Sequence, residues 1–198
     1  MTWLGRLRAY YAHDDPAAET GNFVALVVGW NGPFYPLYVI AIAGRHSAAL
    51  APLTMLATPL FLALPWLSRR SSRAARFGLV LVGTANTLWC IKLLGEASGV
   101  VLFLLPCAAL ATLLFRRREQ TSMLTAVALP LAAWFIPASI FGAALIRFNA
   151  AELAGLHTLN AASALVLTAV LAVQFSRLLQ RVARLPGPMP SVGMADSA

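Results

Sequence analysis

Three asparagines lie within apolar stretches of the sequence and are the side chains best placed to form a polar site there. Asn31, Asn86 and Asn160 each carry an amide that needs hydrogen-bond partners when hydrocarbon surrounds it. Hydrogen bonds between helices are the usual solution and the simpler interpretation. The alternative is a small polar binding site, because His157 and Asn160 are three residues apart and share one helix face. The candidate residues of that site are Asn31, Asn86, Thr87, His157, Asn160 and Ser163.

Ionisable residues are nearly missing from the interiors of the apolar stretches and gather at their ends. Lys92, Glu96, Arg147 and Glu152 all fall at ends expected on the outer side of a membrane. Pairing at the rim is the simpler interpretation, with Lys92 and Glu96 four residues apart on one helix face. An outward-facing polar pocket is the alternative. The scarcity of buried charge argues against a transporter driven by protons or cations.

No combination of residues predicts catalysis. The histidines are His13, His46 and His157, and only the last two are expected at similar depth, which is too little to predict haem. Cys90 and Cys107 are expected at different depths, which favours apolar packing over a disulfide. The sequence has no phosphate-binding loop, zinc-protease motif, nucleophile elbow or paired carboxylates. We therefore expect no enzymatic activity, no cofactor and no metal.

The elements that must position these residues follow from composition. Of the 198 residues 60% are hydrophobic and 11% are charged, whereas a soluble domain carries about 25% charged residues. The apolar content excludes disorder, and two cysteines are too few for a disulfide scaffold. The sequence predicts an all-α, polytopic integral membrane protein with six transmembrane helices, each near the length of about 20 residues that a bilayer requires. The six stretches are residues 23–43, 48–67, 77–94, 99–115, 123–145 and 153–175.

Two short segments are expected to interrupt these helices. Residues 31–36 read Asn-Gly-Pro-Phe-Tyr-Pro and break the first stretch near its middle, since two prolines remove two backbone donors. Such a break lines a substrate site in some transporters and is also common in ordinary membrane helices. Residues 95–99, Gly-Glu-Ala-Ser-Gly, separate the third stretch from the fourth and predict a tight helical hairpin.

Arginine and lysine are sorted unevenly between the segments that join the stretches. Twelve of the fifteen fall on one side, and Arg45, Lys92 and Arg147 fall on the other. By the positive-inside rule the twelve are cytoplasmic, which places both termini in the cytoplasm and agrees with an even number of spans. Topology and contact with anionic lipid heads then account for the net charge of +8, and no nucleic-acid partner is expected. Besides Arg6 and Arg8, the cytoplasmic basic residues are Arg69, Arg70, Arg73, Arg76, Arg116, Arg117, Arg118, Arg177, Arg181 and Arg184.

Three regions follow along the chain. Residues 1–22 form a polar cytoplasmic segment, residues 23–179 the transmembrane domain, and residues 180–198 a cytoplasmic tail that is expected to be largely disordered. Within the first region, residues 2–12 are either a short interfacial helix or a loosely ordered terminus. The helix would place its apolar residues roughly on one face: Trp3, Leu4, Leu7, Tyr10 and Tyr11.

A larger pattern resembles a known kind of module. The runs that carry the resemblance are residues 83–87 (Gly-Thr-Ala-Asn-Thr), 95–106 with the outer-turn motif Gly95, Glu96, Ser98 and Gly99, 115–119 (Phe-Arg-Arg-Arg-Glu) and 159–163 (Leu-Asn-Ala-Ala-Ser). Residues 22–184 are similar to the six-helix membrane modules at the N-terminus of many bacterial class III adenylate cyclases and sensor histidine kinases. Those modules often show a G-x-x-S-G turn, then an apolar helix that ends in basic residues and a glutamate.

The resemblance implies a sensor or anchor module without an output domain, which would act through a separate partner protein. We therefore expect a non-enzymatic sensory or regulatory protein. The alternatives are a small-solute transporter or channel, and an assembly subunit of a larger membrane complex, whose Gly, Ala and Ser faces suit packing against another chain or a second copy. Arginine makes up fourteen of the fifteen basic residues and alanine is abundant. This composition reflects GC-rich codons and favours a bacterial inner membrane as the location.

Overall fold

The computed structural model describes residues 2–183 of the chain, and within that range every regular element is a helix. The α-helices are α1 (Trp3–Tyr11), α2 (Pro16–Asn31), α3 (Tyr35–Ala43), α4 (Thr58–Ser68), α5 (Ser72–Leu94), α6 (Leu104–Leu113), α7 (Gln120–Trp134), α8 (Ala138–Phe141) and α9 (Ala150–Ala183). Short 3-10 helices join them: η1 (Arg45–Ser47), η2 (Ala51–Met55), η3 (Glu96–Ser98), η4 (Val100–Phe103) and η5 (Arg117–Glu119). The all-α prediction is confirmed for the described residues.

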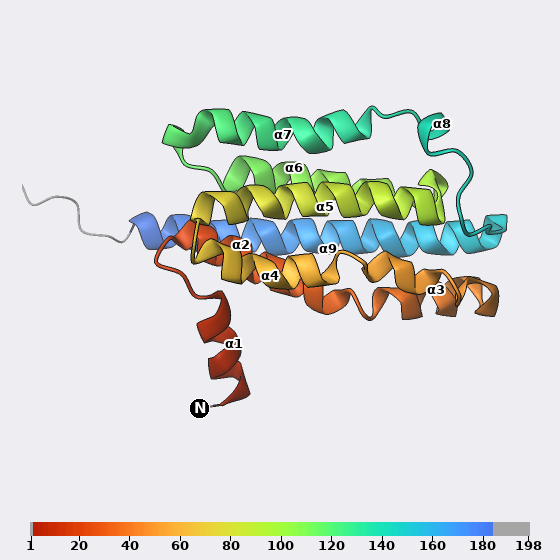
Figure 1. The fold of residues 1–198 in the computed structure, drawn as a ribbon, viewed down its shortest axis with the longest axis horizontal. Helices are drawn as coiled ribbons and strands as arrows, with labels where there is room; N and C mark the ends of the chain where they lie inside the picture. Colours follow the sequence, from red (N-terminus) through yellow and green to blue (C-terminus); the bar gives the residue numbers. More distant parts are fainter. Residues whose placement is uncertain (1, 184–198) are drawn as a thin grey trace, which may run out of the picture.

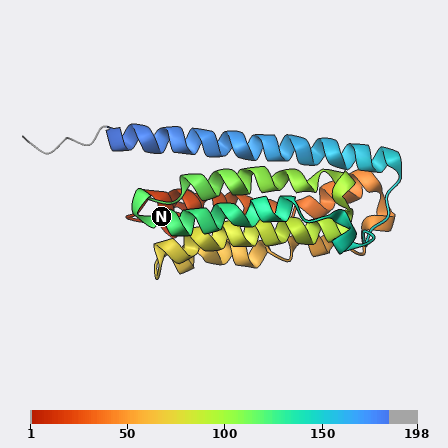
Figure 2. The ribbon, with the colours of Figure 1, turned by 90° about the horizontal axis from the view of Figure 1, so that it is seen from above.

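The long helices run along a common axis and form an elongated bundle (Figure 1). Neighbours along the chain pack against each other, as α2 does on α4, α4 on α5 and α6 on α7. The longest helix, α9, lies along one side of the bundle and touches α3, α6 and the segment η3–η4 (Figure 2). Each apolar stretch expected from the sequence therefore runs once along this bundle, and each such passage is called a leg below.

The first leg is broken where the sequence predicts. Helix α2 ends at Asn31, α3 begins at Tyr35, and the two meet at an angle of 41°. Pro36 lies in the first turn of α3, where the missing backbone donor costs nothing. A side chain at Gly32 would collide with the hydroxyl of Thr58, so the break also lets α2 approach α4 closely.

The predicted hairpin between the third and fourth legs is also confirmed. Gly95 ends α5 with φ +84°, and its N–H donates to the carbonyl of Ile91 at 2.8 Å. Gly99 follows with φ +77°, in the left-handed region that glycine adopts without a Cβ penalty. The two glycines bracket η3 and reverse the chain within five residues, Gly95 to Gly99.

Three helical segments are long and apolar enough to cross a membrane, and a fourth is added if the bent pair α2 and α3 is one span. The three are Ala51–Ser68, Ser72–Leu94 and Ala150–Arg177. The expected number of six is not reached. The segment Val100–Leu113 is apolar but shorter. The stretch 123–145 was expected to be one helix, but α7 ends at Trp134 and the chain passes Pro137 into the short α8, because proline cannot continue the backbone ladder.

Helix α1 leaves the bundle at a steep angle near the start of α2 (Figure 1). Thr2 caps it, its Oγ1 accepting from the N–H of Gly5 at 3.3 Å. The Tyr10 hydroxyl donates to the carbonyl of Leu62 in α4 at 2.8 Å, and the Trp3 ring meets Trp30 edge-on with centroids 6.3 Å apart. Residues 2–12 are therefore mostly helical rather than loosely ordered.

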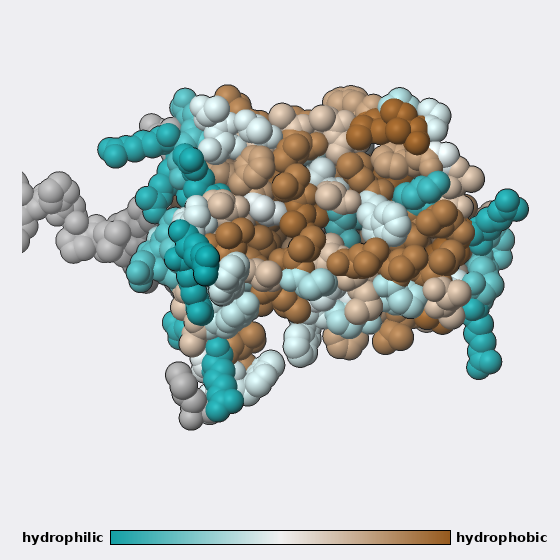
Figure 3. All heavy atoms as spheres, in the orientation of Figure 1, coloured by the Kyte–Doolittle hydropathy of each residue, from teal (hydrophilic) through white to brown (hydrophobic). Residues whose placement is uncertain are grey.

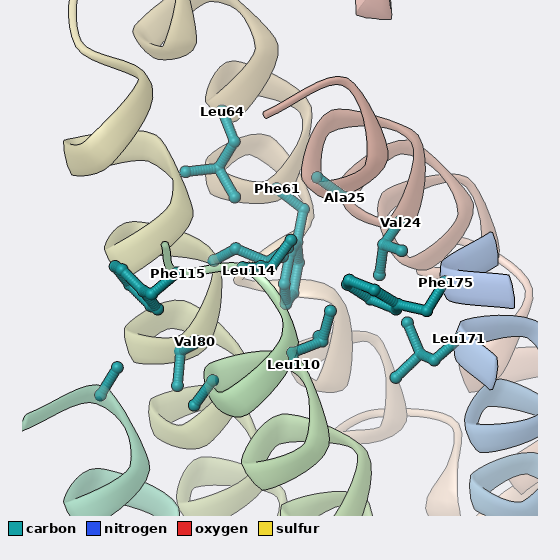
Figure 4. Close-up of a cluster of buried hydrophobic side chains, with 13 residues drawn as sticks. Val24, Ala25, Phe61, Leu64, Val80, Leu110, Leu114, Phe115, Leu171 and Phe175 are labelled. Atoms are coloured by element: carbon teal, nitrogen blue, oxygen red, sulfur yellow. The ribbon is translucent and has the colours of Figure 1, made fainter. Parts of the chain in front are cut away.

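Two large apolar clusters hold the legs together, and a third, small cluster consists of Cys90, Ile91 and Val100. One joins α2, α4, α5, α6 and α9 through residues such as Val24, Phe61, Leu110 and Phe175, whose side chains point toward one another in Figure 4. The other lies toward the opposite end of the bundle and is built from Val39, Ala51, Leu93, Leu94, Ile146 and Leu156. Along α9, the residues between Leu156 and Leu171 belong to neither cluster. This middle section of the bundle contains the candidate site.

Candidate binding site inside the bundle

A cavity of about 560 Å³ lies between the two clusters, lined by residues of α2, α3, η2, α4, α5, η4, α6 and α9 and of the joining segments. Ligand pockets in proteins span about 300–1,000 Å³, so this volume suits a small molecule. Four of the six residues proposed from the sequence line the cavity: Asn31, Asn86, Thr87 and Ser163. His157 and Asn160 do not.

The walls of the cavity are mainly aliphatic and aromatic. Val28, Phe61, Leu110 and Leu167 are among the lining residues, and Asp, Glu, Lys, Arg and His are all absent from the lining. Cys90 and Cys107 also line the cavity; both are buried and free, so they form no disulfide. The site can therefore hold an apolar molecule and offers it a few neutral polar groups.

Asn86 is a lining residue whose side-chain oxygen lacks a hydrogen bond. Its Oδ1 is buried and has no hydrogen-bond partner among the described residues. An unsatisfied buried polar atom costs about 1–3 kcal/mol, and because this oxygen has almost no accessible surface, a molecule in the cavity would reach it only after the amide moves. The Thr84 hydroxyl is also buried and unpartnered in the described chain, but Thr84 is not a lining residue. A hydrogen bond between helices through the Asn86 oxygen, the simpler interpretation of the sequence, is not present among the described residues.

Asn160, in contrast, bonds three segments together. It is fully buried; its Nδ2 donates to the Ser98 carbonyl at 2.9 Å, and its Oδ1 accepts from the Tyr35 hydroxyl at 2.7 Å. One amide thus joins α9 to the outer turn and to the start of α3. Tyr35 also lines the cavity, so the hydrogen-bonded group of Tyr35, Asn160 and Ser98 adjoins the cavity wall. Sequence reasoning missed Tyr35, whose only signal was its position directly after the break at residues 31–36.

The outer-turn motif is a packed turn rather than an open binding loop. The Ser98 hydroxyl donates to the Gly95 carbonyl at 2.6 Å, and Ser98 is fully buried. Gly99 packs against His157 of α9, whose ring carbon Cδ2 would lie 2.8 Å from an added Cβ. His157 itself is exposed, and so is Glu96. The motif residues Gly95, Ser98 and Gly99 therefore position α9, and Glu96 does not contribute to that contact.

Lys92 does not form the expected pair with Glu96, because α5 ends at Leu94 and the helix face that would join them is interrupted. Its ammonium instead donates to the carbonyls of Phe141 at 2.7 Å and Ala143 at 2.9 Å. The segment after α8 is thereby held against the end of α5. Lys92 thus supplies hydrogen bonds to two carbonyls that have no partner within a helix.

Arg76 differs most from its expected place at a lipid-facing surface. It is 3% exposed and donates to the Leu114 carbonyl at 2.6 Å and to both carboxylate oxygens of Glu119, at 2.8 and 2.9 Å. Asp15 lies 3.7 Å away and bonds Arg116 at 3.0 Å. Packing explains why Arg76 is buried: the chain from α6 to η5 covers the start of α5. A buried guanidinium in turn requires carboxylate partners.

These ion pairs set the protonation of the two carboxylates. Hydrogen bonds from Arg76 hold the pKa of Glu119 below its ordinary value, against a smaller opposing effect of burial. Burial raises the pKa of Asp15, but hydrogen bonds from Ser72, Arg116 and the N–H of Ala17 outweigh it and the net pKa is lowered. Both carboxylates are therefore charged at neutral pH and lock α2, α5 and the α6–α7 connection together.

The other basic residues at the end of the bundle that holds Arg76 lie near the surface. Arg69 donates to the carbonyls of Ala9 and Tyr10, and Arg70 lies 4.6 Å above the Trp66 ring. Arg73, Arg118 and Arg177 are exposed. Three more basic residues were predicted at this surface, but their side chains lie outside the described part of the structure: Arg117, Arg181 and Arg184.

Comparisons with known proteins leave the chain without an assigned family: no family model, no curated protein and no solved structure matches it. The resemblance to cyclase and kinase modules stays a prediction. Among the described residues no group of three or more His, Cys, Asp and Glu is placed to hold a metal ion.

Proposed function

We propose that this chain is a non-enzymatic sensory or regulatory membrane protein whose output element is α9. The observation that carries the proposal is the bonding of Asn160, which ties α9 both to the outer turn and to α3. A movement of either segment would be passed to α9 through these two hydrogen bonds, because the amide is fully buried between the segments that it joins. Small shifts of packed helices are a known means by which a signal biases a partner between two states.

The distribution of side chains supports a membrane location. Hydrophilic residues gather mainly at the two ends of the bundle and hydrophobic residues between them (Figure 3). Large apolar side chains such as Leu165, 71% exposed, and Phe135, 80% exposed, face outward. We place the end that carries Arg69, Arg73 and Arg177 in the cytoplasm by the positive-inside rule, in a bacterial inner membrane. All six legs would then cross the bilayer, the shorter α6 and α7 with help from their neighbours.

The output would leave through the far end of α9. This helix has 34 residues and extends beyond Phe175, the last residue that it contributes to the buried clusters. Arg177 is exposed on this extension. A separate signalling protein that contacts the extension is the expected partner.

A photo-crosslinking residue at Arg177 in native membranes tests the proposal. We expect a discrete adduct with a signalling protein, and the Asn160→Leu substitution should change its yield at equal protein level. Thr158→Ala is the matched control, because Thr158 is exposed on α9 and bonds only within the helix. Absence of an adduct, together with specific solute flux through purified protein in liposomes, would contradict the sensory role.

The cavity favours a second candidate, a small-solute transporter. It lies beside the break between α2 and α3, and its polar lining residues include Asn31 and Asn86. The absence of charged lining residues argues against coupling to protons or cations. This candidate predicts that Asn86→Ala abolishes solute uptake while the protein still folds.

A further inference from the structure

We infer that α1 lies on the cytoplasmic surface of the membrane and binds anionic phospholipids there. Trp3 and Leu4 would enter the apolar part of the leaflet, and Arg6 and Arg8 would meet the phosphate groups. The inference rests on the membrane location and orientation proposed above, and it does not involve α9 as an output element.

The C-terminal end of α1 is fixed to the bundle. The Arg69 guanidinium donates to the carbonyls of Ala9 and Tyr10, both at 3.3 Å. The Asn22 amide donates to the carbonyl of Tyr11 at 3.0 Å. The last carbonyls of a helix have no partner within it, so these bonds satisfy the end of α1 from outside. Helix α1 therefore has a defined direction relative to the legs.

The apolar face of α1 points toward the middle of the bundle. Trp3 and Tyr10 are seven residues apart and share this face. The Trp3 ring contacts the ring of Trp30, which lies near the inner end of α2, and the Tyr10 hydroxyl bonds the carbonyl of Leu62, in the middle of α4. Both partners lie deeper along the legs than the start of α2. With the legs across a bilayer, this is the direction of the hydrocarbon.

The N-terminal end of the same face is largely uncovered by the bundle. Trp3 is 63% exposed and Leu4 is 68% exposed. Tryptophan is enriched at membrane surfaces, where its ring sits at the level of the head groups. Leucine gains about 25 cal/mol for each Å² of apolar surface that leaves water. A lipid leaflet therefore covers this part of the face.

Two arginines flank the apolar face. At 3.6 residues per turn, Arg6 and Arg8 lie on opposite edges of it, and both are exposed. Neither forms an ion pair with a carboxylate among the described residues. An arginine stem follows apolar surface while its guanidinium reaches the phosphate level, where it can bind a phosphate through two hydrogen bonds.

Positive charge prevails around α1. Five arginines are exposed on α1 and between α4 and α5: Arg6, Arg8, Arg69, Arg70 and Arg73. From α1 to the end of α2, the carboxylates that form no ion pair in the described chain are those of Asp14 and Glu19. Each basic residue near an anionic leaflet raises its affinity about fivefold. The charge therefore favours anionic over neutral phospholipids.

The angle of α1 suits this role. The legs run along a common axis, and α1 lies at a steep angle to that axis (Figure 1). With the legs across the bilayer, α1 runs close to the plane of the membrane surface, which is how amphipathic helices bind lipid. Hydrophilic residues gather around the same end of the bundle (Figure 3).

Hydrogen–deuterium exchange of the full chain in lipid nanodiscs tests this inference. Phosphatidylcholine alone is compared with a mixture in which about a third of the lipid is phosphatidylglycerol. We expect the amides of α1 to exchange at least about fivefold more slowly in the anionic mixture, and those of α5 to exchange equally in both. Sodium chloride at about 1 M, which shortens the screening length to about 3 Å, should remove most of the difference.

Arg6→Gln combined with Arg8→Gln separates charge from apolar contact. Both side chains are exposed, so the double variant should fold and lose most of the difference between the two lipids. Arg45→Gln combined with Arg147→Gln is the matched control, because it removes the same charge from exposed positions at the opposite end, and it should keep the difference. Leu4→Gln should speed the exchange of α1 in both lipids.

Equal exchange of α1 in the two lipids would overturn the inference, and so would a difference that survives in the Arg6 and Arg8 variant or is lost in the control. Protection of α1 in native membranes but not in anionic nanodiscs would do the same, because it would assign the face to a protein partner. The sensory proposal would survive these outcomes, since the Arg177 crosslink does not involve α1. A chain that stays outside the nanodiscs on size-exclusion chromatography would overturn the membrane location and both proposals.

Discussion

The Tyr35 hydroxyl donates to the Oδ1 atom of Asn160 at 2.7 Å, across 125 positions of sequence. The same amide donates to Ser98, so that both of its polar atoms are satisfied in a site without exposure to solvent. Asn86 of α5 has a buried oxygen with no partner in the described chain. Two asparagines that look alike in the sequence thus have opposite roles, and substitution should separate them.

Replacement of Asn160 by leucine should destabilise the protein. It leaves the Ser98 carbonyl and the Tyr35 hydroxyl without partners, and each lost bond of this kind costs about 1–3 kcal/mol. Thermal unfolding of purified protein, followed by circular dichroism, measures the change. Thr158→Ala on the exposed face of α9 should leave the midpoint within about 1 °C, because surface substitutions have small effects. An unchanged midpoint for Asn160→Leu would contradict a structural role of the amide.

Replacement of Asn86 by leucine should have the opposite effect and raise the stability of the folded protein. The substitution removes an unsatisfied oxygen and adds apolar surface to an apolar cavity wall, so stability should rise by about 1 kcal/mol. The same unfolding measurement checks it. A loss of stability equal to that of Asn160→Leu would show that the Asn86 oxygen has a partner in the folded protein.

The turn at Gly99 should not tolerate alanine. Its φ of +77° costs a residue with a Cβ about 1–2 kcal/mol, and the new Cβ would lie 2.8 Å from the His157 ring. Gly99→Ala should lower the unfolding midpoint and loosen the contact of η3 with α9. The double variant Gly99→Ala with His157→Ala should recover only the part due to the ring, because the His157 Cα would still lie 3.1 Å from the new Cβ and the backbone cost remains. Full recovery would rule out backbone strain.

The local breaks of the fold were predictable because they depend on residue types that act locally. Two prolines define the break at residues 31–36, and Gly95 and Gly99 define the hairpin with positive φ angles. The length of the fifth leg was not predictable from its hydrophobicity alone, since the segment after Trp134 is apolar but not one helix. Hydrophobicity indicates where a chain avoids water and leaves open whether its backbone stays helical.

The candidate site was only partly predictable for a related reason. Burial of a polar side chain is decided by the helix that packs against it. Arg76 has the same residue type and charge as Arg73, three positions earlier, yet one is 3% exposed and the other lies on the surface. Tyr35 reaches Asn160 only because α3 crosses α9 at that level. No periodicity within a single segment contains that information.

The Arg76–Glu119 pair should make the fold sensitive to acid. Because the pKa of Glu119 is lowered in the folded protein, its contribution to stability is complete above its ordinary pKa of 4.5 and is lost as the pH falls below that value. Protonation would leave the buried guanidinium of Arg76 with fewer charged partners, of which Asp15 also has a lowered pKa. The wild-type unfolding midpoint should therefore drop steeply between about pH 5 and pH 3.

Glu119→Gln isolates the share of Glu119 in this drop. The amide keeps the size of the side chain but cannot titrate, so stability at pH 7 should fall by about 1 kcal/mol, since the carboxylate is 18% exposed and water screens the pair. The difference between the variant and the wild type should shrink as the pH falls below 4.5 and vanish once Glu119 is protonated in the folded protein. Glu96→Gln, at an exposed carboxylate of the outer turn, should leave the pH profile unchanged. Parallel profiles for Glu119→Gln and the wild type would show that the acid response arises elsewhere, with Asp15 and its bond to Arg116 as the remaining source.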